Sequence, residues 1–385
     1  MEKAILVGSK KDLDSLKELE RLADTAGAEV LKSLSLRLDR PTPSHFIGKG
    51  QAEEIARLVR EEGADLVIFD MDLHPVQQRN LEEVLGVRVI DRTQLIMDIF
   101  AQHAHTEEGK LEVELAQLKY LLPRLTGKGK ELSDLGGGIG TRGPGEKKLE
   151  YDRRRIRERI KTLERKLEKV MKHRENLRRR RKKLGIPVIA VVGYTNAGKT
   201  TFINKLTHSQ LVAGDKLFLT LDTRMRKLVF PSGKWVILVD TVGFIRRLPP
   251  QLLASFQATL QETLHSQALI HLIDPIPTKW LEMRDTVRRT LEEIGAGEKP
   301  VIEVVNKIDL LSLPERRRIE RILPHAILVS SKTGEGMEEV KKRIEELLEE
   351  REKPWEYFIT ANFSGEREDN KSSIPTGTSL KNEVF

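Results

Sequence analysis

The segment that most constrains this chain is a buried-strand run that leads directly into a glycine-rich turn and a Lys-Thr pair. The run IPVIAVVG ends at Gly193, and GYTNAGKT, residues 193–200, matches the pattern GxxxxGK[ST]. Between a strand and a helix, such a turn lets backbone N–H groups converge on phosphate oxygens, and the helix N-terminus adds its dipole. The pattern therefore predicts an α/β layer with a phosphate-binding loop at the end of one strand.

The chemistry of this loop assigns roles to its side chains. Lys199 is expected to reach the β- and γ-phosphates of a nucleotide, and the Thr200 hydroxyl to bind Mg²⁺. The residues expected to line the nucleotide here are Gly193, Tyr194, Thr195, Asn196, Ala197, Gly198, Lys199, Thr200 and Thr201.

A second element, Asp240-Thr241-Val242-Gly243, follows the buried strand Trp235–Val239. Asp240 fits the carboxylate that supports Mg²⁺ in phosphoryl-transfer proteins, and the Gly243 N–H is placed to sense a γ-phosphate. Thr220, between the two elements, is the candidate for a switch threonine that closes on Mg²⁺. We expect Thr200, Thr220 and Asp240 around the metal, and Lys199, Thr220 and Gly243 in catalysis.

A third element, Asn306-Lys307-Ile308-Asp309, ends the buried strand Pro300–Val305. The Asp309 carboxylate can accept hydrogen bonds from N1 and the amino group of guanine, whereas adenine has no matching donors. Ser330, Ser331 and Lys332 follow the next strand, and their backbone is expected to meet guanine O6. Together the elements predict a site for GTP and GDP.

Outside this region the sequence predicts further α/β structure and a helical hairpin. Residues 1–108 alternate short apolar runs (Ala4–Gly8, Ala64–Asp70, Val87–Ile90) with helical spacing (Ser15–Ala26, Gln51–Glu62, Val76–Leu85), as in a small α/β domain. Residues 109–185 predict two antiparallel helices that share a leucine seam and are joined by an irregular loop over Gly136–Glu146. Residues 186–350 form the nucleotide domain, and the polar residues 351–385 are expected to be largely disordered.

The positive charge is concentrated in the second of these helices. Lys147–Lys183 holds 19 Lys or Arg against 6 Asp or Glu, whereas the whole chain has 67 against 59. Outside the helix, acidic residues therefore outnumber basic ones. The concentration favours a surface for a polyanion, although a solvated coiled-coil face remains an alternative.

The composition limits the kinds of site and the cellular compartment that this chain is expected to have. The chain contains no cysteine, which excludes disulfides and cysteine metal sites, and it has no apolar run long enough to span a bilayer. We expect a cytoplasmic monomer.

Several long runs resemble the HflX family of translation-factor-class GTPases. They include RPTPSHFIGKGQAEEI, GGGIGTRGPGEKKLEYDRRRIRERI, GYTNAGKTTFINKLT and LVDTVGFIRRLP, and the resemblance extends over residues 40 to about 345. It implies an N-terminal α/β domain with a helical hairpin, then a Ras-like GTPase domain. It also implies binding to the large ribosomal subunit and a role in splitting or rescuing stalled ribosomes under stress. The Lys147–Lys183 helix and the Gly136–Gly145 loop would then contact rRNA.

The residue after Gly243 bears on the rate of hydrolysis. Phe244 stands where many small GTPases have a glutamine that orients the attacking water, so basal hydrolysis is expected to be slow until the ribosome stimulates it. In GTPases with an asparagine at the position of Asn196 and no such glutamine, K⁺ often stands in for an arginine finger. Here Asn196 either helps to hold K⁺ or only braces the loop.

Two other functions stay open from the sequence. One is a non-ribosomal signalling switch whose basic hairpin binds an acidic protein or membrane surface. The other is a nucleotide-dependent RNA remodeller whose N-terminal half binds its own nucleotide, an idea that rests only on the glycines of Gly136–Gly145.

Overall fold

The chain forms two compact units. The computed structural model describes residues 1–37, 41–125, 144–209, 217–218, 224–247 and 257–350. Unit 1 is built on residues 1–170 and also includes two short segments, 214–222 and 246–258. Unit 2 contains the remaining residues from 171 onward. The predicted α/β fold class is confirmed, whereas the predicted boundaries at residues 108, 185 and 350 stay predictions.

Unit 1 contains a four-stranded parallel sheet with the order β2-β1-β3-β4. Its strands are β1 (Lys3–Ser9), β2 (Glu29–Leu36), β3 (Leu66–Phe69) and β4 (Arg88–Asp91). Helices α2 (Lys49–Glu62) and α3 (Pro75–Leu85) pack on the sheet through Ile55, Val59 and Leu81. Helices α1 (Leu13–Ala26) and α4 (Arg92–His103) pack against each other and bury Leu19, Leu22 and Phe100.

Two elements of unit 1 had no clear sequence signal. Strand β2 is an edge strand that is only half buried along EVLKSLSL, so it lacks a continuous apolar run. Helix α4 buries Leu95, Ile96, Met97, Ile99 and Phe100, which at 3.6 residues per turn span about 200° of its circumference. Burial over more than half of the circumference weakens the one-sided apolar pattern that identifies an amphipathic helix.

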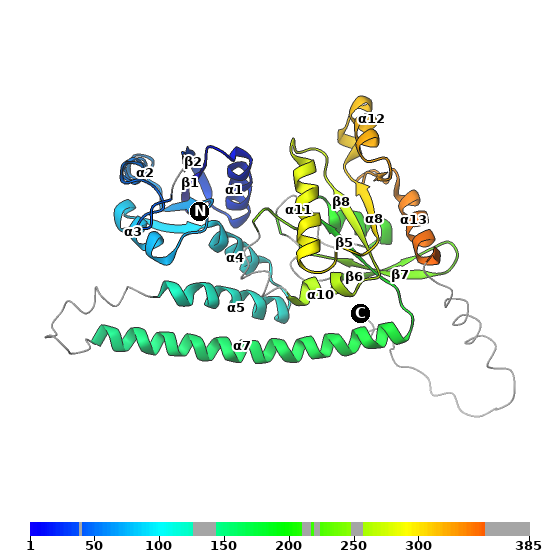
Figure 1. Cartoon of the computed structure of the whole chain (residues 1–385), viewed down its shortest axis with the longest axis horizontal. Helices are drawn as coiled ribbons and strands as arrows, with labels where there is room; N and C mark the ends of the chain where they lie inside the picture. Colours follow the sequence, from blue (N-terminus) through cyan, green and yellow to red (C-terminus); the bar gives the residue numbers. More distant parts are fainter. Residues whose placement is uncertain (38–40, 126–143, 210–216, 219–223, 248–256, 351–385) are drawn as a thin grey trace. The chain divides into compact units, whose positions relative to one another are not determined.

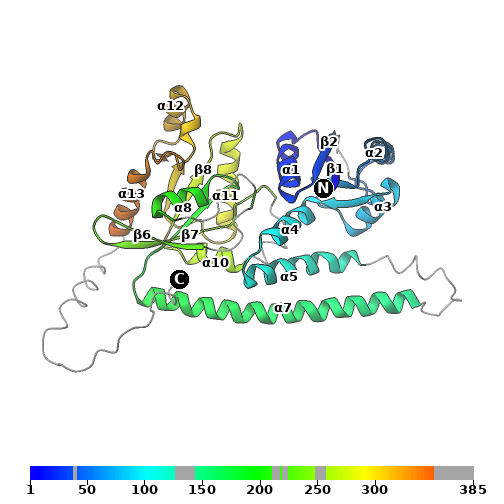
Figure 2. The same ribbon diagram turned by 180° about the vertical axis from the view of Figure 1, so that it is seen from behind.

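The predicted hairpin is present as α5 (Glu107–Arg124) and α7 (Pro144–Lys183). The two helices run antiparallel in both views (Figures 1 and 2). Leu115, Leu163 and Leu167 form the centre of their apolar seam, and ion pairs join Glu114 to Arg159 and Lys119 to Glu164. One detail of the prediction was wrong: residues 144–146, expected in the irregular loop, begin α7. Proline is well tolerated in a first helical turn, where its missing N–H has no partner to lose.

Unit 2 contains a six-stranded sheet with the order β10-β9-β8-β5-β7-β6, parallel except for β6. In chain order its strands are β5 (Val188–Gly193), β6 (Arg224–Val229), β7 (Trp235–Asp240), β8 (Ala268–Ile273), β9 (Val301–Val305) and β10 (Ile327–Leu328). Its helices are α8 (Lys199–Thr207), α10 (Gln257–His265), α11 (Trp280–Glu293), α12 (Leu313–Ile322) and α13 (Met337–Glu350), with a 3₁₀ turn, η1, at Ile308–Leu310.

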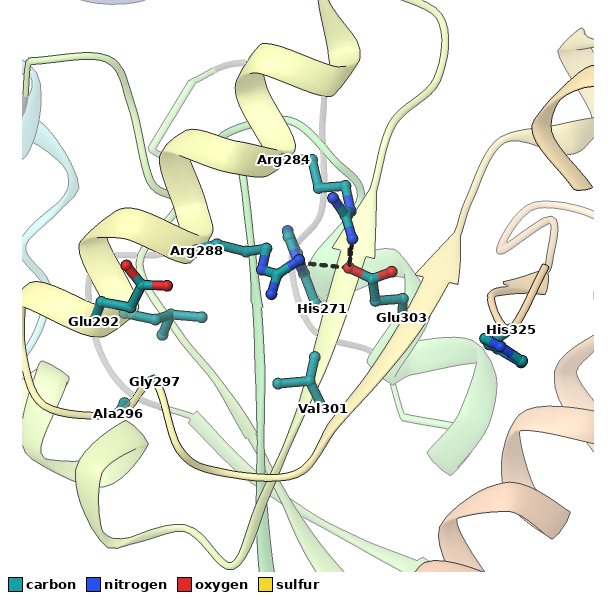
Figure 3. A pocket seen from close by; sticks show the side chains of 10 residues that line it. His271, Arg284, Arg288, Glu292, Ala296, Gly297, Val301, Glu303 and His325 are labelled. Atoms are coloured by element: carbon teal, nitrogen blue, oxygen red, sulfur yellow. Dashed lines mark hydrogen bonds and ion pairs between the residues drawn. The ribbon is translucent and has the colours of Figure 1, made fainter. Parts of the chain in front are cut away.

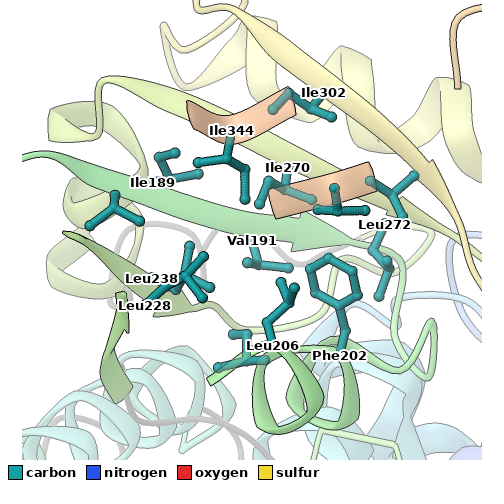
Figure 4. Close-up of a cluster of buried hydrophobic side chains, with 14 of the residues drawn as sticks. Ile189, Val191, Phe202, Leu206, Leu228, Leu238, Ile270, Leu272, Ile302 and Ile344 are labelled. Atoms are coloured by element: carbon teal, nitrogen blue, oxygen red, sulfur yellow. The ribbon is translucent and has the colours of Figure 1, made fainter. Parts of the chain in front are cut away.

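The core of unit 2 fixes the strand ends in space. Phe202 and Leu206 of α8 and Ile344 of α13 pack on one face of the sheet against β5 and its neighbours (Figure 4). Because β5, β7, β8, β9 and β10 are parallel, their carboxyl ends meet at one edge. In open α/β sheets this edge is where ligands bind.

Candidate functional site

The loop after β5 wraps around the ammonium group of a buried lysine. Lys199 donates to the carbonyl oxygens of Gly193 and Tyr194, both at 3.1 Å. Burial lowers the pKa of Lys199 to about 8, an effect that Asp240 partly opposes. Gly198 has φ +88°, and a Cβ there would lie 2.6 Å from Nδ2 of Asn306. Only glycine therefore fits this position, where the loop turns into α8.

The carboxyl end of β7 brings an aspartate to the start of α8. Asp240 is fully buried, and its Oδ2 accepts a 2.8 Å hydrogen bond from the Thr200 hydroxyl. The neighbouring Thr241 hydroxyl donates to Val191 O of β5 at 2.7 Å, which holds the segment against the sheet. A hydroxyl and a carboxylate side by side are hard oxygen donors of the kind that Mg²⁺ prefers.

The segment after Asp240 lies directly on the phosphate loop. A Cβ on Gly243 would be 2.8 Å from Thr195 Cα and 3.1 Å from Lys199 Nζ. Phe244 donates its N–H to Gly193 O at 3.1 Å and accepts a 2.7 Å hydrogen bond from Thr195 N–H. Its side chain is only 3% exposed. Phe244 thus joins the two loops through its backbone, a role that its side-chain chemistry did not indicate.

An asparagine at the end of β9 ties three loops together. Asn306 Nδ2 donates to Ala197 O at 2.9 Å, inside the phosphate loop. Its Oδ1 accepts hydrogen bonds from the N–H and the hydroxyl of Ser331, at 2.9 and 2.8 Å. Asn306 is 2% exposed, so these bonds are shielded from water and fix the loops relative to each other.

The remaining polar groups at this edge are oriented by their neighbours. The Ser330 hydroxyl donates to Asp309 Oδ1 at 2.6 Å. Within the part of the chain that the structure describes, no hydrogen bond occupies Asp309 Oδ2. Lys307 has a left-handed φ of 63° and forms a 2.7 Å ion pair with Asp274, which follows β8. Asp274 was not among the predicted site residues, although it follows a buried strand at the same edge.

The structure therefore brings most of the predicted residues together. Hydrogen bonds and close approaches join the phosphate loop to Asp240, Gly243 and Asn306, and Asp309 to Ser330. Asn196 has a left-handed φ of 61°, which asparagine tolerates. Thr201 and Lys332 are exposed and are not part of the hydrogen-bonded cluster. Thr220 and residues 136–143 lie outside the described residues.

The basic helix α7 has two kinds of arginine. Arg181 is buried and donates to Glu262 of α10 at 2.9 Å, and Arg178 donates to Gln261 at 2.9 Å. These two side chains are bound within unit 2, which corrects the expectation that the whole Lys147–Lys183 helix offers its charges to RNA. Lys161, Arg165 and Lys169 are exposed and follow one another at the four-residue spacing of a single helix face.

Three family models together match most of the chain. The model described as GTP-binding GTPase N-terminal matches residues 13–101, GTP-binding GTPase Middle Region matches residues 103–181, and 50S ribosome-binding GTPase matches residues 188–307. No helix among the described residues is sufficiently long and apolar to cross a membrane.

Named relatives are similar over nearly the whole length. The GTPase HflX of Caldanaerobacter subterraneus subsp. tengcongensis is 50% identical over 376 residues, which cover 95% of this chain and 86% of that protein. The GTPase HflX of Escherichia coli K12 is 45% identical over 353 residues, with 90% and 83% covered. The crystal structure of a GTP-binding protein from Sulfolobus solfataricus in complex with GDP is 27% identical and covers 91% of this chain and 100% of that one, with a TM-score of 0.47.

Proposed function

This chain belongs to the HflX family of GTPases, and on that premise we propose that it is a GTP-controlled switch that binds the large ribosomal subunit and splits or rescues stalled ribosomes under stress. The chain hydrolyses GTP to GDP and phosphate, as its family does. A ribosomal partner would place it in the cytoplasm. The observation that carries the proposal is the cluster of nucleotide elements at the carboxyl edge of the unit 2 sheet, where Asn306 bonds both to the phosphate loop and to Ser331.

Each element of this edge has a role toward GTP in the proposal. Residues 193–201 cradle the phosphates, with Lys199 toward the β- and γ-phosphates. Asp309 accepts from guanine through the oxygen that Ser330 does not occupy, and the backbone at Ser330–Lys332 meets guanine O6. Lys307 packs along the base while Asp274 holds its ammonium group.

The metal in this proposal is Mg²⁺, and the residues present fit it. Thr200 and Asp240 supply two oxygen donors 2.8 Å apart beside the phosphate loop. Mg²⁺ typically takes few protein ligands and completes its octahedron with phosphate oxygens and water. When bound, it neutralises charge on the transferring phosphoryl group. Thr220 would complete the protein contribution from the switch segment.

The position of Phe244 supports slow hydrolysis in the absence of a partner. Its backbone N–H and carbonyl are both used by the phosphate loop, and its phenyl ring is buried. The residue therefore has no group with which to orient an attacking water. We propose that GTP orders the segments around Thr220 and Gly243, and that the ribosome supplies what the isolated chain lacks.

A monovalent cation is the second candidate for stimulation. Asn196 lies within the phosphate loop, and its amide oxygen would help to hold K⁺ beside the β- and γ-phosphates, where charge grows in the transition state. K⁺ should then raise turnover above the rate in Na⁺ at equal ionic strength, and Asn196→Ala should remove that difference with little loss of GDP affinity. Equal rates in the two salts would leave Asn196 as a brace only.

Part of α7 is suited to rRNA. Lys161, Arg165 and Lys169 are exposed on the face opposite the leucine seam, which Leu163 and Leu167 occupy. Phosphate contacts from such a face release counterions, so binding would weaken steeply with salt.

Sucrose-gradient co-sedimentation with purified large subunits tests the proposal. The chain should sediment with subunits in the presence of a non-hydrolysable GTP analogue and stay largely at the top of the gradient with GDP. Lys161→Glu, Arg165→Glu and Lys169→Glu together should reduce binding about tenfold or more and flatten its salt dependence. The matched control reverses three exposed arginines of α12, Arg317, Arg318 and Arg321. Absence of co-sedimentation in either nucleotide state would refute the ribosomal role, and equal losses in both triple variants would refute the assignment to α7.

A further inference from the structure

A cavity of about 310 Å³ lies in unit 2 between helix α11 and strands β8 and β9. Its lining includes His271 of β8, Arg284, Arg288 and Leu291 of α11, and Val301 and Glu303 of β9 (Figure 3). It shares no lining residue with the nucleotide site. The cavity is therefore a separate feature of the GTPase domain, and two of its polar groups have no hydrogen-bond partner among the residues that the structure describes.

The first of these groups is a histidine in the middle of a buried strand. His271 is 1% exposed, and its Nδ1 has no hydrogen-bond partner in the described part of the chain. The nearest carboxylate oxygen, Glu303 Oε1, is 4.0 Å away, too far for a hydrogen bond. Burial, and after it the positive charges of Arg284 and Arg288, lower the pKa of His271 to about 3, so the ring is neutral near pH 7. A neutral ring still has one N–H to donate, and leaving it unmatched in the interior is unfavourable.

The second group is an arginine on the facing helix. Arg284 is neutralised by Glu303, with Nη2 2.7 Å from Oε1. Arg288, one turn further along α11, forms no hydrogen bond or ion pair with any residue that the structure describes. In Figure 3 its side chain reaches from α11 toward His271 and Glu303. Among the described residues, the guanidinium of Arg288 thus has no counter-ion, and it faces the buried His271 Nδ1, which has no hydrogen-bond partner.

The rest of the lining is partly apolar. Leu291 and Ala296 are buried, and Val301 is 41% exposed. Glu292 lies toward the other end of the cavity, next to Gly297. The acidic part of a ligand would therefore be favoured at the Arg288 end, and its carbon skeleton along Leu291 and Val301.

We propose that this cavity binds a small organic anion, whose carboxylate or phosphate group lies between Arg288 and His271 and whose apolar part lies over Leu291 and Val301. The anion accepts hydrogen bonds from the guanidinium and from Nδ1–H of the neutral imidazole, and it supplies the missing counter-charge. Because Glu292 and Glu303 also carry negative charge nearby, the affinity for a minimal ligand is expected to be on the order of 1 mM.

The test uses the full chain saturated with GDP, so that added anions do not bind at the phosphate loop. Benzoate, phenyl phosphate and inorganic phosphate are titrated while histidine ring signals are followed by NMR, with the His271 signal assigned from its loss in His271→Gln. Benzoate and phenyl phosphate should shift this signal saturably, and their comparison distinguishes the carboxylate from the phosphate head group. Inorganic phosphate should bind more weakly than phenyl phosphate.

The matched variants are Arg288→Ala and Arg289→Ala. Both residues are exposed on α11, but only Arg288 lines the cavity. Arg288→Ala should weaken binding about tenfold, and Arg289→Ala should leave it unchanged. No saturable shift with any of the three anions, or equal affinity in the two variants, would overturn the proposal. If inorganic phosphate and phenyl phosphate bound with equal affinity, the proposed apolar contact with Leu291 and Val301 would be wrong.

Discussion

In each of the two sheets, an aspartate stands at the carboxyl end of a buried strand. The two aspartates differ in the side chain that donates a hydrogen bond to the carboxylate. In unit 1, Asp70 follows β3 and accepts from Arg92 at 2.7 Å, while Arg92 also donates to Glu18 at 2.5 Å. In unit 2, Asp240 ends β7 and accepts from the hydroxyl of Thr200. A guanidinium is itself the counter-ion, whereas a hydroxyl and a carboxylate can both become ligands to a metal. The unit 1 edge is therefore closed by the protein, and the unit 2 edge is suited to a ligand.

The largest effect expected from this comparison is on stability in unit 1. Burial opposes the charge of Arg92, but Glu18 and Asp70 outweigh it and raise the pKa of Arg92 above its usual value. Arg92→Ala would remove the buried cation that both Glu18 and Asp70 contact, and it should lower the free energy of unfolding by about 3–5 kcal/mol, measured by chemical denaturation. Arg88→Ala, which removes an exposed ion pair with Glu2, should cost less than about 1 kcal/mol. Similar small losses in both variants would mean that the unit 1 edge is not held by this cluster.

The next effect is on nucleotide choice in unit 2. Asp309→Asn should weaken GTP binding by about 3 kcal/mol, because an amide presents a donor where guanine also presents donors. The variant should favour xanthosine nucleotides, whose 2-oxo group accepts from the amide. Fluorescent-nucleotide titrations of the wild-type chain and of Asp309→Asn with guanosine, xanthosine and adenosine diphosphates measure the change. Wild-type chain that binds ADP as tightly as GDP at this site would contradict the guanine assignment.

These two sheet edges also show which features of a site can be predicted from the sequence and which cannot. The nucleotide elements were predictable because each is a buried strand with its loop, confined to a few neighbouring residues such as Gly193–Thr200 or Asn306–Asp309. ADLVIFD and WVILVD look alike in sequence, yet one carboxylate meets Arg92 and the other Thr200. The partner in each case is set by the sheet order, which the local pattern does not contain.

Long-range partners account for the other differences. The sequence pattern places Arg181 on a basic helix face. In the structure its guanidinium is buried and donates a hydrogen bond to the carboxylate of Glu262, 81 residues away. Reversing Arg178–Arg181 to Glu would therefore mix loss of charge with loss of packing, and Lys161, Arg165 and Lys169 are the cleaner test. Asp274 could have been found, because HLID ends a buried strand one place along the sheet from Asn306.

The smallest expected effect is a pH dependence of nucleotide affinity. Burial holds the pKa of Lys199 at about 8 in the nucleotide-free chain. Phosphate oxygens favour the charged ammonium, so binding raises this pKa and takes up a proton once the pH passes about 8. The affinity for GDP should then fall about threefold between roughly pH 7.5 and 8.5. Calorimetry in buffers of different ionisation enthalpy measures the proton uptake directly. Lys199→Gln should bind far more weakly and without this uptake, and equal proton uptake in the variant would remove Lys199 as its source.

The central claim is that the unit 2 edge is a GTP-hydrolysing site that depends on a ribosomal partner. Single-turnover hydrolysis of radiolabelled GTP, with and without large ribosomal subunits, tests it most directly. We predict slow hydrolysis by the chain alone and an increase of at least about 100-fold with saturating subunits. Asp309→Asn should show the same stimulation with xanthosine triphosphate in place of GTP. Fast hydrolysis by the chain alone that subunits leave unchanged would contradict the account.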